Sequence, residues 1–126
     1  MKKIAVIEDN PDNRLLLRAI LEDRYEISDY ESGFEALSGM PAKPPDLVLL
    51  DISLPGMDGT AVLRKIRAEP ALSGLPVIAL TAHAMSGDRE KYLSLGFDNY
   101  VAKPIVDETI LLDAIEYGLN KSPGRD

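Results

Sequence analysis

Short apolar runs alternate with amphipathic segments along the whole chain, and this alternation is the strongest constraint on the fold. Residues 4–7, 47–50 and 77–80 form continuous runs rich in branched side chains, which is typical of parallel strands covered on both faces. Residues 100–102 form a weaker run of the same kind. Residues 25–30 mix polar and apolar side chains, as expected of an edge strand. The pattern therefore predicts five strands.

Amphipathic segments between these runs predict five helices. In the first, Asn10 is suited to cap the helix and Pro11 to open it, where its missing N–H costs no hydrogen bond. The second is expected over residues 32–38, ended by Gly39, and the fourth over about 86–95 with few apolar anchors. That fourth helix should be the least firmly packed. The expected buried helix faces are Leu16, Leu17, Ile20 and Leu21 in the first helix, Val62, Leu63 and Ile66 in the third, and Ile110, Leu111, Ala114 and Ile115 in the last.

Five strand–helix units in succession predict an α/β protein with a doubly wound, five-stranded parallel sheet between two layers of helices. The 126 residues suffice for one domain, expected over 1–119, with 120–126 as a flexible tail or linker stub. No cysteine is present, which excludes disulfides and thiol chemistry. A net charge of −7 argues against direct binding of nucleic acid. The first apolar run is too short for a signal peptide or membrane span, so we expect a cytoplasmic protein without membrane contact.

Polar side chains follow the apolar runs where the carboxyl ends of the strands should meet. Glu8 and Asp9 follow the first run, Asp51 the third, Thr81 the fourth and Lys103 the fifth. In an open α/β sheet the binding site lies at this edge. Two carboxylates about 4 Å apart repel by roughly 4 kcal/mol at an effective dielectric near 20. An all-oxygen acidic site of this kind suits Mg²⁺, which can neutralise a phosphoryl group while a further acid attacks it.

Short motifs at these strand ends resemble the receiver domain of two-component response regulators. The similarity spans residues 3 to about 119, and residues 81–85 resemble stand-alone receivers and those of hybrid histidine kinases. The motifs are Glu8-Asp9, Asp51, Met57-Asp58-Gly59, Thr81-Ala82 and Lys103-Pro104. The resemblance implies a flavodoxin-like fold with strand order 2-1-3-4-5. It also implies a signalling domain that catalyses only its own phosphorylation and dephosphorylation.

The resemblance further implies a role for each matching position. Asp51 would accept a phosphoryl group from a histidine kinase or histidine phosphotransfer protein. The output would be a protein-interaction surface on the fourth helix, fifth strand and fifth helix. The remaining roles are Mg²⁺ or Mn²⁺ binding by Glu8, Asp9, Asp51 and the Ser53 backbone carbonyl, phosphoryl contact by Thr81, Lys103 and the Ala82 backbone, switching by Thr81 and Tyr100, rate tuning by Ser53 and His83, and a cis peptide bond at Lys103-Pro104.

Several alternatives stand beside the receiver resemblance. Asp9 can serve as a helix-entry residue, and Asp58 is better explained as a turn and helix cap than as a ligand. A flavodoxin or dinucleotide-binding protein is disfavoured, because the loop after the first strand is acidic where such proteins cradle phosphate. An aspartyl phosphatase is disfavoured because Ser53 stands where its general acid would be. The chain can also be the isolated receiver of a larger hybrid kinase or DNA-binding regulator.

Overall fold

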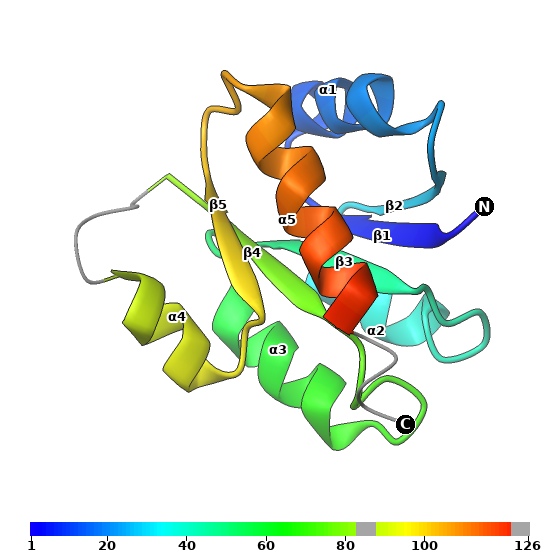
Figure 1. The fold of residues 1–126 in the computed structure, drawn as a ribbon. Helices are drawn as coiled ribbons and strands as arrows, with labels where there is room; N and C mark the ends of the chain where they lie inside the picture. Colours follow the sequence, from blue (N-terminus) through cyan, green and yellow to red (C-terminus); the bar gives the residue numbers. More distant parts are fainter. Residues whose placement is uncertain (83–87, 122–126) are drawn as a thin grey trace.

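The computed structural model describes residues 1–82 and 88–121, which form a parallel sheet between two layers of helices. The sheet has the predicted order β2-β1-β3-β4-β5 (Figure 1). The strands are β1 (Lys3–Ile7), β2 (Glu26–Tyr30), β3 (Leu47–Asp51), β4 (Val77–Thr81) and β5 (Asn99–Ala102). The helices are α1 (Pro11–Leu21), α2 (Gly33–Gly39), α3 (Gly59–Ala68), α4 (Asp88–Leu95) and α5 (Glu108–Lys121).

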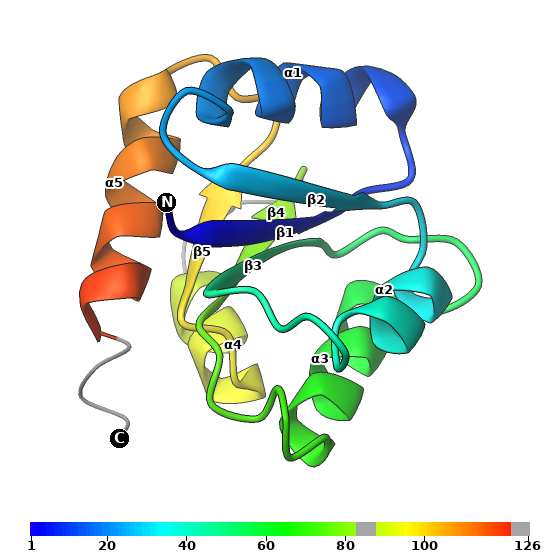
Figure 2. The same ribbon diagram turned by 90° about the vertical axis from the view of Figure 1, so that its right-hand side faces the viewer.

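The helices divide between the two faces of the sheet, with α1 and α5 on one side and α2, α3 and α4 on the other (Figure 2). Strand side chains alternate between the two cores. Ile4 and Val6 pack in the core under α1 and α5, whereas Ala5 and Ile7 pack in the core on the opposite face. Burial of β1, β3 and β4 on both faces explains why their sequences are continuous apolar runs. The edge strand β2 is largely exposed, as its mixed composition predicted.

Local signals place the helix starts. Asn10 caps α1 as predicted: its side-chain oxygen accepts from the backbone N–H groups of Asp12 and Asn13, at 2.8 and 3.2 Å. The predicted cap at Asp58 is also confirmed, because its Oδ1 accepts from the Ala61 N–H at 2.9 Å. The expected start of α4 falls outside the described residues.

Two predicted core residues are exposed, which corrects the expected helix faces. Leu16 is 43% exposed and Ile110 is 56% exposed. Each immediately precedes a fully packed residue, Leu17 or Leu111. Successive side chains on a helix differ by roughly 100° in direction. Because Leu17 and Leu111 face the sheet, Leu16 and Ile110 are turned toward solvent. Helix α5 also continues past residue 119, where the domain was expected to end.

Arg67, near the end of α3, links this helix to the segments that lead into β4 and β5. The Arg67 guanidinium donates to the backbone oxygens of Leu75 and Gly96 at 2.6 and 2.8 Å, and to Asp98 Oδ2 at 3.1 Å. Asp98 is 7% exposed and also accepts from the Val77 N–H at 2.8 Å. These contacts hold the start of β4 beside the segment that leads into β5.

In the described part of the chain, none of the helices combines the length and apolar character needed to cross a membrane.

Candidate functional site

Three carboxylates meet at the carboxyl edge of the sheet. One ligand oxygen each from Glu8, Asp9 and Asp51 lies within 4.8 Å of the others. Their proximity follows from strand pairing, because β1 and β3 are adjacent and in a register that sets Ile7 beside Leu50. Glu8 is fully buried and Asp51 is 3% exposed, whereas Asp9 is at the surface. The predicted acidic cluster is therefore assembled in the fold.

Lys103 contributes the positive charge of this cluster. Its Nζ lies 3.0 Å from Glu8 Oε1 and 3.1 Å from Asp51 Oδ2. The residue follows β5, and its backbone N–H donates to the Thr81 carbonyl at 2.7 Å, which extends the β4–β5 pairing by one residue. The Lys103–Pro104 peptide bond is cis, as predicted. Lys103 thus contacts both buried acids from the far side of β4.

The two buried carboxyls differ in their tendency to ionise. Burial, together with a side-chain hydrogen bond to Asp51, raises the pKa of Glu8 to about 7. Burial also opposes ionisation of Asp51, but hydrogen bonds from Glu8, the Ser53 backbone N–H and Lys103 outweigh it and lower the Asp51 pKa. The pair therefore favours a proton on Glu8 and a negative charge on Asp51. Burial likewise opposes the charge on Lys103, but its contacts with these acids raise its pKa.

Two residues of α1 complete the surroundings of Glu8 and were not singled out in the sequence. Asn13 Nδ2 donates to Glu8 Oε1 at 3.0 Å. The Arg14 guanidinium donates to the backbone oxygens of Glu8 and Asp9 at 2.7 and 3.0 Å. Both residues lie in the first turn of α1, directly after the Glu8-Asp9 pair. This position in the sequence could have indicated that they lie close to the acids. Arg14 thus holds the backbone of the acidic loop, and Asn13 holds the Glu8 side chain.

The other predicted site residues lie around the cluster at different depths. Thr81 ends β4 and is 1% exposed, whereas Ala82 beside it is at the surface. The Ser53 backbone N–H donates to Asp51 Oδ1 at 3.0 Å, and the Ser53 side chain is exposed. Tyr100 is half-buried on β5. His83 lies outside the described residues.

Tyr92 of α4 is a further residue beside the site that the sequence did not indicate. Its hydroxyl lies 3.0 Å from Thr81 Oγ1 in the interior. The sequence of α4 contains Leu93 and Leu95 as equally apolar candidates for burial, and they are 38% and 42% exposed. No local pattern distinguished the tyrosine from them.

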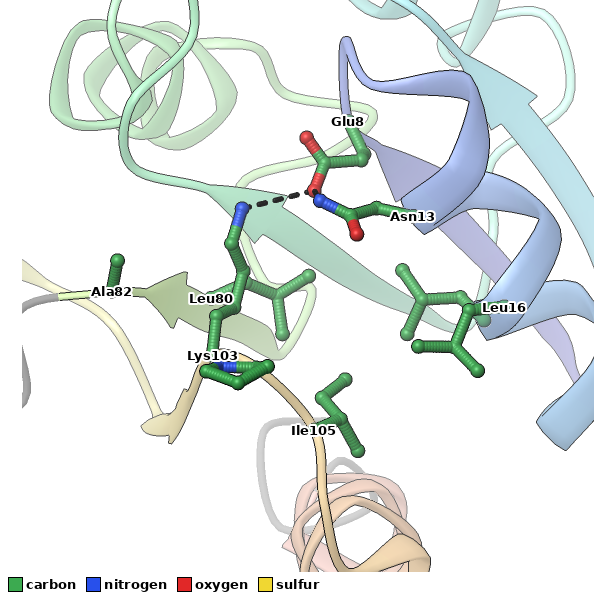
Figure 3. Close-up of a pocket in the computed structure, with 9 residues that line it drawn as sticks. Glu8, Asn13, Leu16, Leu80, Ala82, Lys103 and Ile105 are labelled. Atoms are coloured by element: carbon green, nitrogen blue, oxygen red, sulfur yellow. Dashed lines mark hydrogen bonds and ion pairs between the residues drawn. The ribbon is translucent and has the colours of Figure 1, made fainter.

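A pocket of about 260 Å³ opens beside the cluster. Figure 3 shows Lys103 reaching toward Glu8 and Asn13 on one side of it, while Leu16, Leu80 and Ile105 line the apolar side. The pocket lies between α1 and the segment after β5. The acidic cluster is thus bordered by an apolar hollow.

The fold and the cluster can be compared with known proteins. The family model described as the response regulator receiver domain matches residues 4–116. This chain belongs to that family. The match covers both halves of the sheet and every strand end that contributes to the cluster. Receiver domains are signalling domains rather than enzymes that turn over an external substrate.

Individual relatives agree with this receiver assignment. The sensor protein GacS of Pseudomonas syringae pv. syringae is 39% identical over 112 residues, which cover 86% of this chain and 12% of that protein. The polar-differentiation response regulator DivK of Brucella ovis is 40% identical over 105 residues, covering 82% of this receiver and 85% of DivK. The chain therefore spans about an eighth of GacS but most of DivK.

A solved structure shows the same architecture. The receiver domain of the sensor histidine kinase PA1611 from Pseudomonas aeruginosa PAO1 is 33% identical, with a TM-score of 0.84 over 94% of this chain and 98% of that one. That structure holds a magnesium ion in its active site cleft. The donor atoms in this receiver suit the same class of ion, because the cluster consists of carboxylate oxygens alone.

Proposed function

We propose that Asp51 of this receiver accepts a phosphoryl group from a phosphohistidine on a histidine kinase or histidine phosphotransfer protein. The observation that carries the proposal is the position of Asp51 at the centre of the site. Among the described acids, it is the one that both contacts Lys103 and accepts the Ser53 N–H. A nucleophile needs such fixed neighbours, since phosphoryl transfer depends mainly on positioning and charge.

In the proposed reaction, a carboxylate oxygen of Asp51 attacks the phosphorus of the partner's phosphohistidine. An oxygen–phosphorus bond forms and the phosphorus–nitrogen bond breaks, with its electron pair passing to the imidazole nitrogen, which takes up a proton from water. The Lys103 ammonium is already 3.1 Å from Asp51 and balances part of the charge on the phosphoryl oxygens. The Thr81 hydroxyl and the Ala82 backbone contact those oxygens at the end of β4. Hydrolysis of the resulting acyl phosphate returns the domain to its starting state.

Glu8, Asp9 and Asp51, with the Ser53 backbone carbonyl, would hold the divalent cation. When bound, Mg²⁺ supplies positive charge that offsets both the carboxylates and the phosphoryl oxygens. Mn²⁺ accepts the same oxygen ligands. The magnesium in the PA1611 receiver supports this assignment. Arg14 would keep the backbone of the Glu8-Asp9 loop in place for that role, and Asn13 would orient the Glu8 carboxylate.

Phosphorylation would be read out on the surface formed by α4, β5 and α5. Thr81 and Tyr100 would act as the switch, because their strands are neighbours and Thr81 lies beside the acidic cluster. Ser53 and His83 would tune the lifetime of the phosphoryl group from positions two residues beyond Asp51 and Thr81. Replacing either should change the dephosphorylation rate with little effect on Mg²⁺ binding.

The phosphoacceptor assignment is tested by labelling with acetyl phosphate and Mg²⁺, followed by intact-protein mass spectrometry. We expect one added phosphate in the parent protein and none in Asp51→Asn. Asp113→Asn, an exposed change of the same type on α5, is the matched control and should be labelled like the parent. Full labelling of Asp51→Asn would overturn the assignment.

A further inference from the structure

Tyr92 connects the end of β4 to α4 through the protein interior. Its side chain is 4% exposed, and its hydroxyl lies 3.0 Å from the Oγ1 of Thr81, which is 1% exposed. Both partners of this hydrogen bond are therefore shielded from water. Breaking the bond without a replacement would leave the buried Tyr92 hydroxyl without this hydrogen bond, which is costly.

The same tyrosine anchors α4. Among the residues of Asp88–Leu95 it is the only buried one. Its ring packs edge-on against Phe97, with centroids 6.0 Å apart, and at a 42° tilt against Tyr100, with centroids 5.6 Å apart. A shift of Tyr92 must therefore move α4, change the surroundings of Tyr100, or do both.

The Tyr92 hydroxyl can keep its hydrogen bond to Thr81 while the Thr81 hydroxyl also bonds a phosphoryl oxygen. A hydroxyl group donates one hydrogen bond and can accept two. Thr81 can thus donate to a phosphoryl oxygen while its own oxygen accepts from the Tyr92 hydroxyl. The two bonds in such a chain polarise and strengthen each other.

We propose that Tyr92 is a positioning residue that transmits a displacement of Thr81 to α4 and Tyr100. The inference rests on the proposed function, since it takes the phosphoryl group on Asp51 as the cause of that displacement. This path through the core is additional to the direct contact between the neighbouring strands β4 and β5. The hydroxyl of Tyr92 contacts Thr81 and its ring packs against Phe97 and Tyr100, so we assign it no part in the chemistry.

The test uses backbone amide NMR of the chain before and after addition of Mg²⁺ and beryllofluoride, a mimic of the phosphoryl group. In Tyr92→Phe we expect the amides of Ser53 and Lys103 to respond as in the parent. The response of Tyr100 and α4 should shrink, with the ratio of switched to resting conformer falling roughly fivefold, as for the loss of one hydrogen bond. Tyr25→Phe removes the hydroxyl of a half-buried tyrosine elsewhere and should respond fully.

A double-mutant cycle separates the hydrogen bond from packing alone. Thr81→Val removes the other hydroxyl, so without beryllofluoride the losses in the free energy of unfolding caused by Thr81→Val and Tyr92→Phe should be less than additive in the double variant. Thr81→Ser, which keeps a hydroxyl, should preserve the effect of Tyr92→Phe. Thermal unfolding of each variant checks that it is folded.

The outcomes distinguish this inference from the proposed function. A full Tyr100 response in Tyr92→Phe would overturn the inference alone, as would losses that simply add in the double variant. A parent protein whose Ser53 and Lys103 amides ignore beryllofluoride would overturn the proposed function and, with it, this inference.

Discussion

Asp58 caps α3 through one carboxylate oxygen, which accepts from the Ala61 N–H at 2.9 Å and from the Thr60 hydroxyl at 2.7 Å. These two bonds lower the pKa of Asp58. A group with a lowered pKa in the folded state stabilises the fold above its unfolded pKa, and the stabilisation is lost as pH falls through the folded pKa. The capping contribution should therefore be complete at neutral pH and fade below about pH 4.

Replacing Asp58 tests both parts of this statement. Asp58→Ala should lower the free energy of unfolding at pH 7 by about 1 kcal/mol, the usual loss for an N-cap. Asp58→Asn keeps an acceptor oxygen that does not titrate, so it should nearly match the parent at pH 7 and lose less stability on acidification. Urea unfolding at pH 7 and at about pH 3 measures the difference. Identical pH dependence in the parent and Asp58→Asn would contradict the prediction.

At the scale of elements, α3 begins so close to the end of β3 that its first residue must be glycine. A Cβ on Gly59 would lie 2.6 Å from the Asp51 backbone oxygen and 2.7 Å from Ile52 Cα. The Gly59 N–H also donates to the Ile52 carbonyl at 2.9 Å. The obstructing atoms are backbone and cannot rotate aside. The start of α3 and the backbone of the proposed phosphoacceptor therefore move together.

Gly59→Ala should destabilise the protein by about 1–3 kcal/mol, as overpacked sites do. It should also slow labelling by acetyl phosphate, since the clash displaces the backbone of Asp51. Gly74→Ala is the matched control, because a Cβ there meets no atom within 4 Å. Equal unfolding midpoints and labelling rates for the two variants would show that the contact at Gly59 relaxes without cost.

Helix α4 illustrates how an element can be predicted while its anchoring is not. Its sequence contains few apolar residues, which predicted weak packing, and Tyr92 is indeed the only buried residue of Asp88–Leu95. Which residue would be buried depended on contacts with Thr81 and Phe97, and on the ring of Tyr100. Those partners belong to other elements, so no periodicity within α4 could identify it.

For the whole molecule, the net charge of −7 and the three clustered carboxylates lead us to expect that a divalent cation would stabilise the fold. Binding to the folded state alone should raise the free energy of unfolding by about 1.4 kcal/mol at a Mg²⁺ concentration ten times its Kd. The measurement is Tm against Mg²⁺, with Na⁺ at equal ionic strength as the control. Asp9→Asn should weaken the effect, because it removes a proposed ligand from the surface of the site. A Tm that rises equally with both salts would argue against a specific site.

The sequence by itself determined the secondary structure, the fold class and the positions of the strand-end acids. Runs such as residues 47–50 are apolar because both faces of β3 are buried. Asn10 and Asp58 mark helix starts because capping is a local interaction over two or three residues. Parallel strands bring their carboxyl ends to one edge, so Asp51 and Glu8 could be assigned to one site before any distance was known.

The tertiary structure alone decided which side chains share hydrogen bonds and protons within that site. Lys103 contacts Glu8 and Asp51 from 95 and 52 residues away, and burial raises the Glu8 pKa while the Asp51 pKa falls. The partnership of Tyr92 with Thr81 likewise depends on how α4 lies against the sheet. Hydrogen bonding and desolvation act between groups that are close in space, and local sequence patterns do not encode which distant residues those will be.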